Sequence, residues 1–95
     1  MITNNLLLKL KDRNEENIAA ARDMLLSMQG EIEYLRDLQV EVNIRHGQSS
    51  YDLILITKFA SMEDLDAYLI HPVHIEVSKY IAGVVETGAA VCYES

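Results

Sequence analysis

Four consecutive apolar residues near the middle of the chain, Leu53-Ile54-Leu55-Ile56, constrain its fold more than any other feature. They lie in a segment, residues 51–59, whose composition predicts a β-strand. Successive side chains of a strand point to opposite faces, so this strand is apolar on both faces and must be covered on both. A chain of 95 residues has little spare sequence with which to build both covers.

Three further strands are expected. Residues 2–11 contain three successive leucines and predict the first strand, and residues 89–93 predict the last. The second strand alternates apolar and polar side chains, which is typical of a strand with one wet face. Its apolar positions are Leu38, Val40, Val42 and Ile44, and the segment Gly47-Gln48-Ser49-Ser50 is the expected turn.

A helix is expected between the first two strands. Asn14 is a suitable N-cap, because its side-chain oxygen can accept a hydrogen bond from an unpaired N–H group of the first turn. Gly30 is the residue expected just beyond the end of the helix. Apolar residues recur at three- and four-residue spacing and form one face. They are Ile18, Ala21, Leu25 and Met28.

The second helical region is interrupted by the only proline, Pro72. Ser61 followed by Asp64 resembles a capping box and predicts its start. Proline disfavours helical geometry in the residue before it and suits the first position of a new helix, so a break is expected at His71-Pro72. The expected buried positions are Leu65, Tyr68 and Leu69 before the break, and Val73, Val77, Tyr80 and Val84 after it.

The order β-α-β-β-α-β predicts an α+β fold, the ferredoxin-like plait, as a single domain over residues 1–95. Both helical regions of a plait pack on one face of the sheet, which leaves the other face bare. Each apolar side chain left in water would forfeit roughly 1.5–3 kcal/mol. A second copy of the chain is the expected cover, so we predict a homodimer through the sheet face.

Charge and composition narrow the possible partners. The chain has 8 basic and 15 acidic residues, a net charge of −7, which disfavours nucleic acid and anionic membrane surfaces. No apolar run approaches the ~20 residues that span a bilayer, and no basic leader is visible, so a cytoplasmic location is expected. The single cysteine, Cys92, cannot form an internal disulfide and is expected to be a small core residue.

The densest cluster of reactive side chains lies at the proline break, in Tyr68, His71 and His74. An imidazole titrates near neutral pH, so His74 could act as a general base, and Tyr68 could donate a hydrogen bond to a carbonyl. Both residues could equally be structural. His71 and His74 are three apart, but the proline between them breaks the helix that would align them, so no metal site and no cofactor are expected. His71 is expected to fix the turn.

On these residues the chain resembles the stress-responsive α/β barrel (Dabb) family. The resemblance covers nearly the whole chain and is sharpest at Tyr68, His71-Pro72 and His74. It also includes Met1-Ile2, residues 7–12, residues 51–53, Phe59, residues 61–65 and Tyr93. It implies a dimeric α/β barrel, built from two ferredoxin-like protomers.

The family resemblance implies no single activity. A plant polyketide cyclase of the family uses a tyrosine and a histidine as its acid/base pair, and these match Tyr68 and His74. Two further histidines of that pocket fall at Asn4 and Leu53 here, and many family members have a histidine where this chain has Asn4. These departures count against cyclase chemistry.

Three functions therefore remain open, and the sequence does not decide whether the protein is an enzyme. The leading hypothesis is a dimer that binds a small apolar or aromatic molecule between sheet and helices, with Tyr68, His71 and His74 as ligand-binding residues. The first alternative is a cofactor-free enzyme, such as a cyclase, isomerase or small monooxygenase, with Tyr68 and His74 as catalytic residues. The second is a purely structural, stress-stable oligomer.

Overall fold

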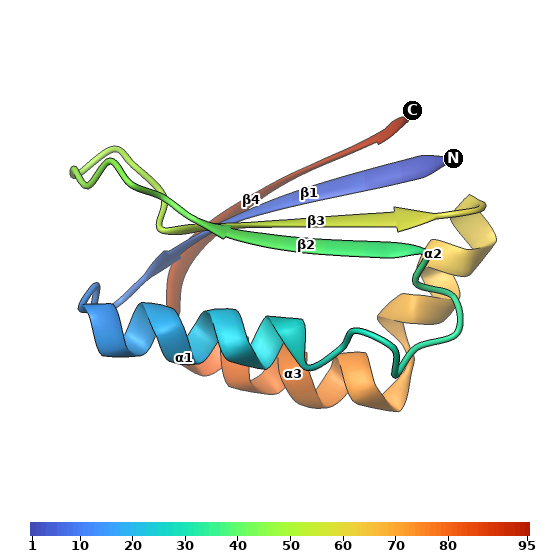
Figure 1. Cartoon of the computed structure of the whole chain (residues 1–95), viewed down its shortest axis with the longest axis horizontal. Helices are drawn as coiled ribbons and strands as arrows, with labels where there is room; N and C mark the ends of the chain where they lie inside the picture. The colour runs from blue at the N-terminus through green and yellow to red at the C-terminus, as the bar shows by residue number, and fades with distance from the viewer.

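The computed structural model of the chain describes all residues, 1–95. Its element order is the expected one, with the second helical region divided into two helices (Figure 1). The fold is therefore α+β and ferredoxin-like. The elements are β1 (Ile2–Leu10), α1 (Glu15–Leu26), β2 (Asp37–Val42), β3 (Leu53–Phe59), α2 (Met62–Leu69), α3 (Pro72–Val84) and β4 (Val85–Glu94).

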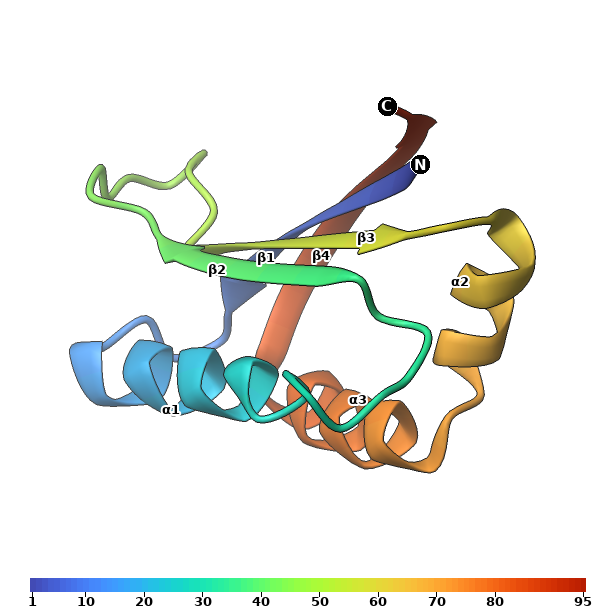
Figure 2. The ribbon, with the colours of Figure 1, turned by 45° about the vertical axis from the view of Figure 1, so that its right-hand side comes forward.

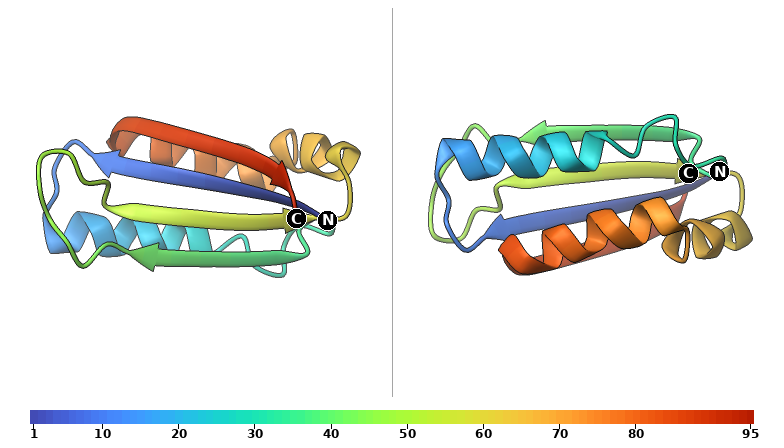
Figure 3. Two further views of the ribbon diagram at one scale, coloured as in Figure 1. Left: turned by 90° about the horizontal axis from the view of Figure 1, so that it is seen from above. Right: turned by 90° about the horizontal axis from the view of Figure 1, so that it is seen from below.

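The four strands form one antiparallel sheet in the order β2-β3-β1-β4. Helices α1 and α3 lie side by side across one face of this sheet, and α2 stands at its end, below the tip of β3 (Figure 2). The opposite face has no helix on it (Figure 3, left). The two chain ends meet on adjacent strands, where the Ser95 amide donates to the Met1 carbonyl at 2.8 Å.

The core lies between the sheet and the helices. In β3 the side chains of Leu53, Leu55 and Phe59 point into it and are at most 4% exposed. Ile54 and Ile56 alternate with them, point to the bare face and are only half-buried. This is the two-sided apolar strand that the sequence predicts, with one side covered by the chain itself and the other not.

Local signals set the helix starts as expected. The Asn14 side chain accepts a hydrogen bond from the Asn17 amide at 2.8 Å, and the Ser61 hydroxyl accepts one from the Asp64 amide at 3.2 Å. Pro72 is the first residue of α3, where its missing N–H group costs nothing. The predicted break at His71-Pro72 is therefore confirmed, and it sets α3 at an angle to α2.

Helix α1 ends at Leu26 with Ser27 as its C-cap, two residues before the C-cap that Gly30 predicts. The Ser27 hydroxyl donates to the Met24 carbonyl at 2.5 Å, and amides after the helix donate to carbonyls three residues earlier. Gly30 is still the one residue with positive φ, at 80°, so it shapes the turn after the helix and does not end the helix itself.

Three side-chain expectations were wrong. Ile44 is 95% exposed in a loop, because the side chain of Asn43 bonds to the Tyr51 carbonyl and to the Arg45 amide and turns the chain out of β2. Leu69 is 46% exposed because α2 ends there, at the margin of the sheet. Cys92 is exposed because it lies near the end of the edge strand β4, in which every residue from 86 to 94 is exposed.

A buried ion pair, which the sequence did not indicate, holds the loop end of the sheet. Asp52 is 1% exposed and accepts hydrogen bonds from the Leu10 amide at 2.9 Å and from Arg13 Nε at 3.0 Å. The same guanidinium donates to the carbonyls of Gly47 and Ser50 at 2.9 and 3.0 Å. This network is structural, because every polar group in it has a protein partner.

Candidate functional site

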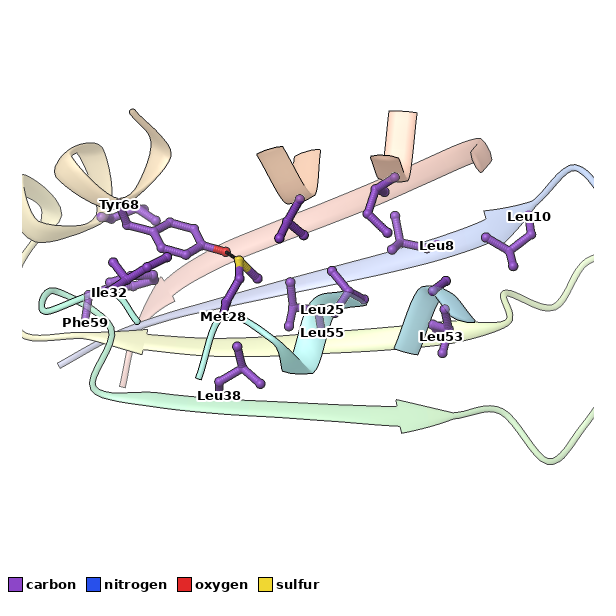
Figure 4. Packing of buried hydrophobic residues seen from close by; sticks show 14 of the residues in the cluster. Leu8, Leu10, Leu25, Met28, Ile32, Leu38, Leu53, Leu55, Phe59 and Tyr68 are labelled. Carbon is purple, nitrogen blue, oxygen red and sulfur yellow. Dashed lines mark hydrogen bonds between the residues drawn. The ribbon is translucent and has the colours of Figure 1, made fainter. Parts of the chain in front are cut away.

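Tyr68 stands on the last turn of α2 and points into the core. It is 3% exposed, and its ring packs against Phe59, with ring centroids 4.9 Å apart. Its hydroxyl has one protein partner, the Met28 sulfur at 3.7 Å, which is a weak acceptor (Figure 4). Burial raises the pKa of Tyr68 to about 12, so the phenol stays protonated and can donate a hydrogen bond at any physiological pH.

His74 lies in the first turn of α3, and its ring packs on that of Tyr68, with centroids 4.4 Å apart. Its Nδ1 is 3.0 Å from the Leu69 carbonyl oxygen. A carbonyl oxygen can only accept, so Nδ1 carries the hydrogen and Nε2 of the neutral ring is left as an acceptor. Burial lowers the pKa of His74; the Leu69 hydrogen bond opposes this shift, and the nearby His71 adds to it.

A cavity of about 220 Å³ joins these two residues to the sheet. Its walls come from β1, β3 and all three helices, and eight of its eleven lining residues are hydrophobic. The groups on its wall that can form hydrogen bonds are the side chains of Asn4, Tyr68, His74 and Ser78. No charged side chain lines it. The cavity is therefore apolar, with a few neutral polar groups, as small-molecule sites generally are.

Asn4 brings a part of the sequence into the site that lies far from the His-Pro segment. It is the position where the resemblance implies a histidine in many relatives, and the structure places it on the cavity wall. Its side-chain amide makes no hydrogen bond within the protein. Leu53, the other departure, is 2% exposed in the core and does not line the cavity.

Ser78 is the polar lining residue that the sequence analysis did not mention. It follows His74 by four residues on α3, so both side chains lie on the same face of that helix. The spacing was a usable signal, but serine is too common on helix surfaces for that spacing to stand out.

His71 lies at the junction of α2 and α3 and does not line the cavity. Its Nδ1 accepts the Val73 amide hydrogen at 3.2 Å and so caps α3, as expected of a residue that fixes the turn. The other ring nitrogen, Nε2, is 3.1 Å from a Glu33 carboxylate oxygen. Both nitrogens thus have protein partners, which holds the first turn of α3, and with it His74, in place.

The other candidate groups lie apart from the cavity. His46 is exposed in the loop after β2, as expected. Nowhere do three His, Cys, Asp or Glu side chains come close enough together to bind a metal ion. None of the helices has the length and apolar character that crossing a membrane requires.

Comparison with known proteins now decides the family. The model of the Stress Responsive A/B Barrel Domain (Dabb) matches residues 2–95. The chain belongs to this family. The resemblance seen at Tyr68, His71-Pro72 and His74 is confirmed over nearly the full sequence. Among curated protein sequences, none matches this Dabb chain.

Solved structures support the same fold. A dimeric protein of unknown function from Bacteroides fragilis is 24% identical, with a TM-score of 0.84, and the match covers 99% of this chain and 95% of that one. A dimeric ferredoxin-like protein of unknown function from Thermobifida fusca is 18% identical, with a TM-score of 0.87 and coverages of 99% and 90%. The hydroxynitrile lyase of Passiflora edulis is 11% identical, with a TM-score of 0.83 and coverages of 97% and 90%. At these identities the likeness shows the fold alone.

Proposed function

We propose that this Dabb protein is a homodimer that binds a small apolar or aromatic molecule in the cavity between the sheet and the helices. The observation that carries the proposal is the cavity itself, with its mainly hydrophobic wall and the polar groups of Tyr68 and His74. An engineered apolar cavity of about 150 Å³ suffices to bind benzene. A cavity of about 220 Å³ is therefore large enough for a molecule with one ring.

The three predicted ligand-binding residues have different parts in this proposal. Tyr68 and His74 face the ligand, one as a donor and the other as an acceptor of hydrogen bonds. His71 contributes by capping α3, which fixes the position of the His74 ring. A purely structural protein would have a filled core here, so the open cavity favours ligand binding over the structural alternative.

A titration with toluene, followed through the histidine ring resonances by NMR, tests the binding proposal. We expect the His74 resonances to shift and to saturate, because the ring lines the cavity. His46 is the internal control, since its ring is exposed in a distant loop and should not respond. If the His74 resonances do not move, or if both histidines move together without saturating, the proposal is wrong.

The dimer is proposed on the bare sheet face. Strand pairing places the apolar side chains of that face in one patch, in which Val91 is 63% exposed. Two of the matched structures are described as dimeric, which supports self-association. A second copy would remove this patch from water, and light scattering after size-exclusion chromatography tests the dimer directly. The patch comprises Leu7, Ile54, Ile56, Ala89, Val91 and Tyr93.

A cofactor-free enzyme is the second candidate function, favoured by one feature of the site. The Nε2 atom of His74 is unprotonated in the neutral ring, and this ring packs on the ring of a protonated phenol, so the side chains of a base and an acid are in contact. Replacing His74 by Ala and Tyr68 by Phe should then abolish any turnover found with cyclisation, isomerisation or oxygenation substrates. Turnover that survives both changes would exclude this pair as catalysts.

A further inference from the structure

We infer that the ligand of this cavity is a neutral one-ring molecule with a hydroxyl group, which donates to His74 Nε2 and accepts from the Tyr68 hydroxyl. This inference rests on the proposed ligand-binding function and specifies its ligand class. Three features of the cavity carry it: the fixed hydrogen-bonding roles of the two polar side chains, the absence of charge on the wall, and the volume.

The hydrogen-bonding roles follow from what the protein already does with each group. The Leu69 carbonyl fixes the hydrogen of His74 on Nδ1, so Nε2 can offer a ligand only a lone pair. Tyr68 has a weak sulfur partner, Met28, and gains by exchanging it for an oxygen acceptor. The site thus presents one acceptor and one donor. A hydroxyl group is the smallest ligand group that can donate and accept at once.

The charge of the ligand follows from the cavity wall. No lysine or arginine lines it, and the burial that keeps the His74 ring neutral also withholds an imidazolium. A carboxylate placed there would lose its water without gaining a counter-charge, which is strongly unfavourable. The overall charge of −7 opposes an anion further. A carboxylate or phosphate ligand is therefore excluded in favour of a neutral one.

The apolar part of the ligand follows from the volume and the lining. A cavity of about 220 Å³ with eight hydrophobic lining residues accepts a single ring with a short substituent. The Asn4 amide, which has no partner in the protein, is on the same wall and is available to a second polar substituent or to a water molecule.

Three probes of similar size test the inference: benzyl alcohol, ethylbenzene and benzoate, each titrated at pH 8 while the His74 resonances are observed. We expect benzyl alcohol to bind tightest, ethylbenzene about 25-fold more weakly because it makes neither hydrogen bond, and benzoate not measurably. If ethylbenzene or benzoate binds as tightly as benzyl alcohol, the inferred ligand class is wrong, although the cavity remains a binding site. If none of the three moves the His74 resonances, the proposed function fails as well.

A variant separates hydrogen bonding from shape. Tyr68→Phe keeps the ring that packs on Phe59 and removes only the hydroxyl, whose single protein partner is a sulfur atom. We expect it to weaken benzyl alcohol binding about fivefold and to leave ethylbenzene binding unchanged. Equal losses for the two probes would show that the change acts through cavity shape, which would contradict the assigned donor role.

Discussion

The two faces of the sheet are formed by alternate residues of the same strands, and the helices cover only one of them. On the helix side, Leu53, Leu55 and Phe59 are at most 4% exposed, because α1, α2 and α3 cover them. On the other side, Ile54 and Ile56 are equally apolar and have no layer above them (Figure 3, left). The difference shows that a strand's composition specifies how many covers it needs but not which chain supplies them. One face stabilises the monomer, and we propose that the other is stabilised by a partner.

The largest effect should come from truncating a large core side chain on the covered face. Phe59 is fully buried and supports the Tyr68 ring, so Phe59→Ala should lower the free energy of unfolding by about 3–5 kcal/mol. Urea unfolding at one fixed protein concentration measures the change. The control is Gln39→Ala, an exposed position on the bare face, which should change the free energy by at most about 0.5 kcal/mol. Similar losses for the two variants would show that the faces do not differ as described.

A charge on the bare face should act on assembly and leave the fold intact. Ile54→Lys places an ammonium group in the middle of the proposed interface, and we expect the dimer to weaken about 100-fold, or about 3 kcal/mol. Light scattering at several concentrations measures the dissociation, and circular dichroism checks the fold. Ala20→Lys adds the same charge on the outer side of α1 and should leave the dimer intact. If Ile54→Lys does not change the molecular mass in solution, this face is not the interface.

The smallest effect should be a pH dependence of ligand affinity, which comes from residues of the covered face alone. Burial lowers the pKa of His74, and only the neutral ring can accept through Nε2. Benzyl alcohol affinity should therefore be constant from about pH 7 to 9, fall once the pH drops below that lowered pKa, and level off about fivefold lower, because protonation removes one hydrogen bond and leaves the apolar contacts. Tyr68 contributes no change, because its pKa is about 12.

A variant identifies the titrating group. His71 is the other histidine close to His74, so a pH profile of the wild-type protein alone would not distinguish them. His74→Gln should bind benzyl alcohol more weakly and should show no fall in affinity at low pH. His71→Gln should still show that fall. If the affinity of His74→Gln still falls at low pH, His74 is not the titrating group.

Much of the fold was predictable because its signals are local. The Asn14 and Ser61 caps, the break at Pro72 and the alternation in β3 each depend on neighbouring residues, and each was confirmed. Ile44 was misplaced because its outcome depends on the side chain of Asn43, which competes with the strand for the backbone. The exposure of Cys92 depends on which strands the helices cover, and this is a property of the whole sheet.

The candidate site was predictable only in part. Tyr68 and His74 stand out in the sequence because of the His-Pro segment, and the structure brings their rings together at 4.4 Å. The cavity, the place of Asn4 on its wall and the Leu69 bond that fixes the His74 tautomer depend on packing between separate elements. The spacing of these residues along the chain therefore gives no direct indication of the cavity, of the place of Asn4 on its wall or of the Leu69 hydrogen bond.

The meeting of Met1 and Ser95 on adjacent strands has a practical consequence. With the Ser95 amide 2.8 Å from the Met1 carbonyl, a linker of a few residues could join the two ends into a ring, and new ends could then be opened in the exposed loop around His46. Such a circular permutant would keep every strand pairing. A label attached to a chain end would then lie at the opposite end of the sheet. With the two forms of the protein, a spectroscopic probe could therefore be placed at either end of the sheet.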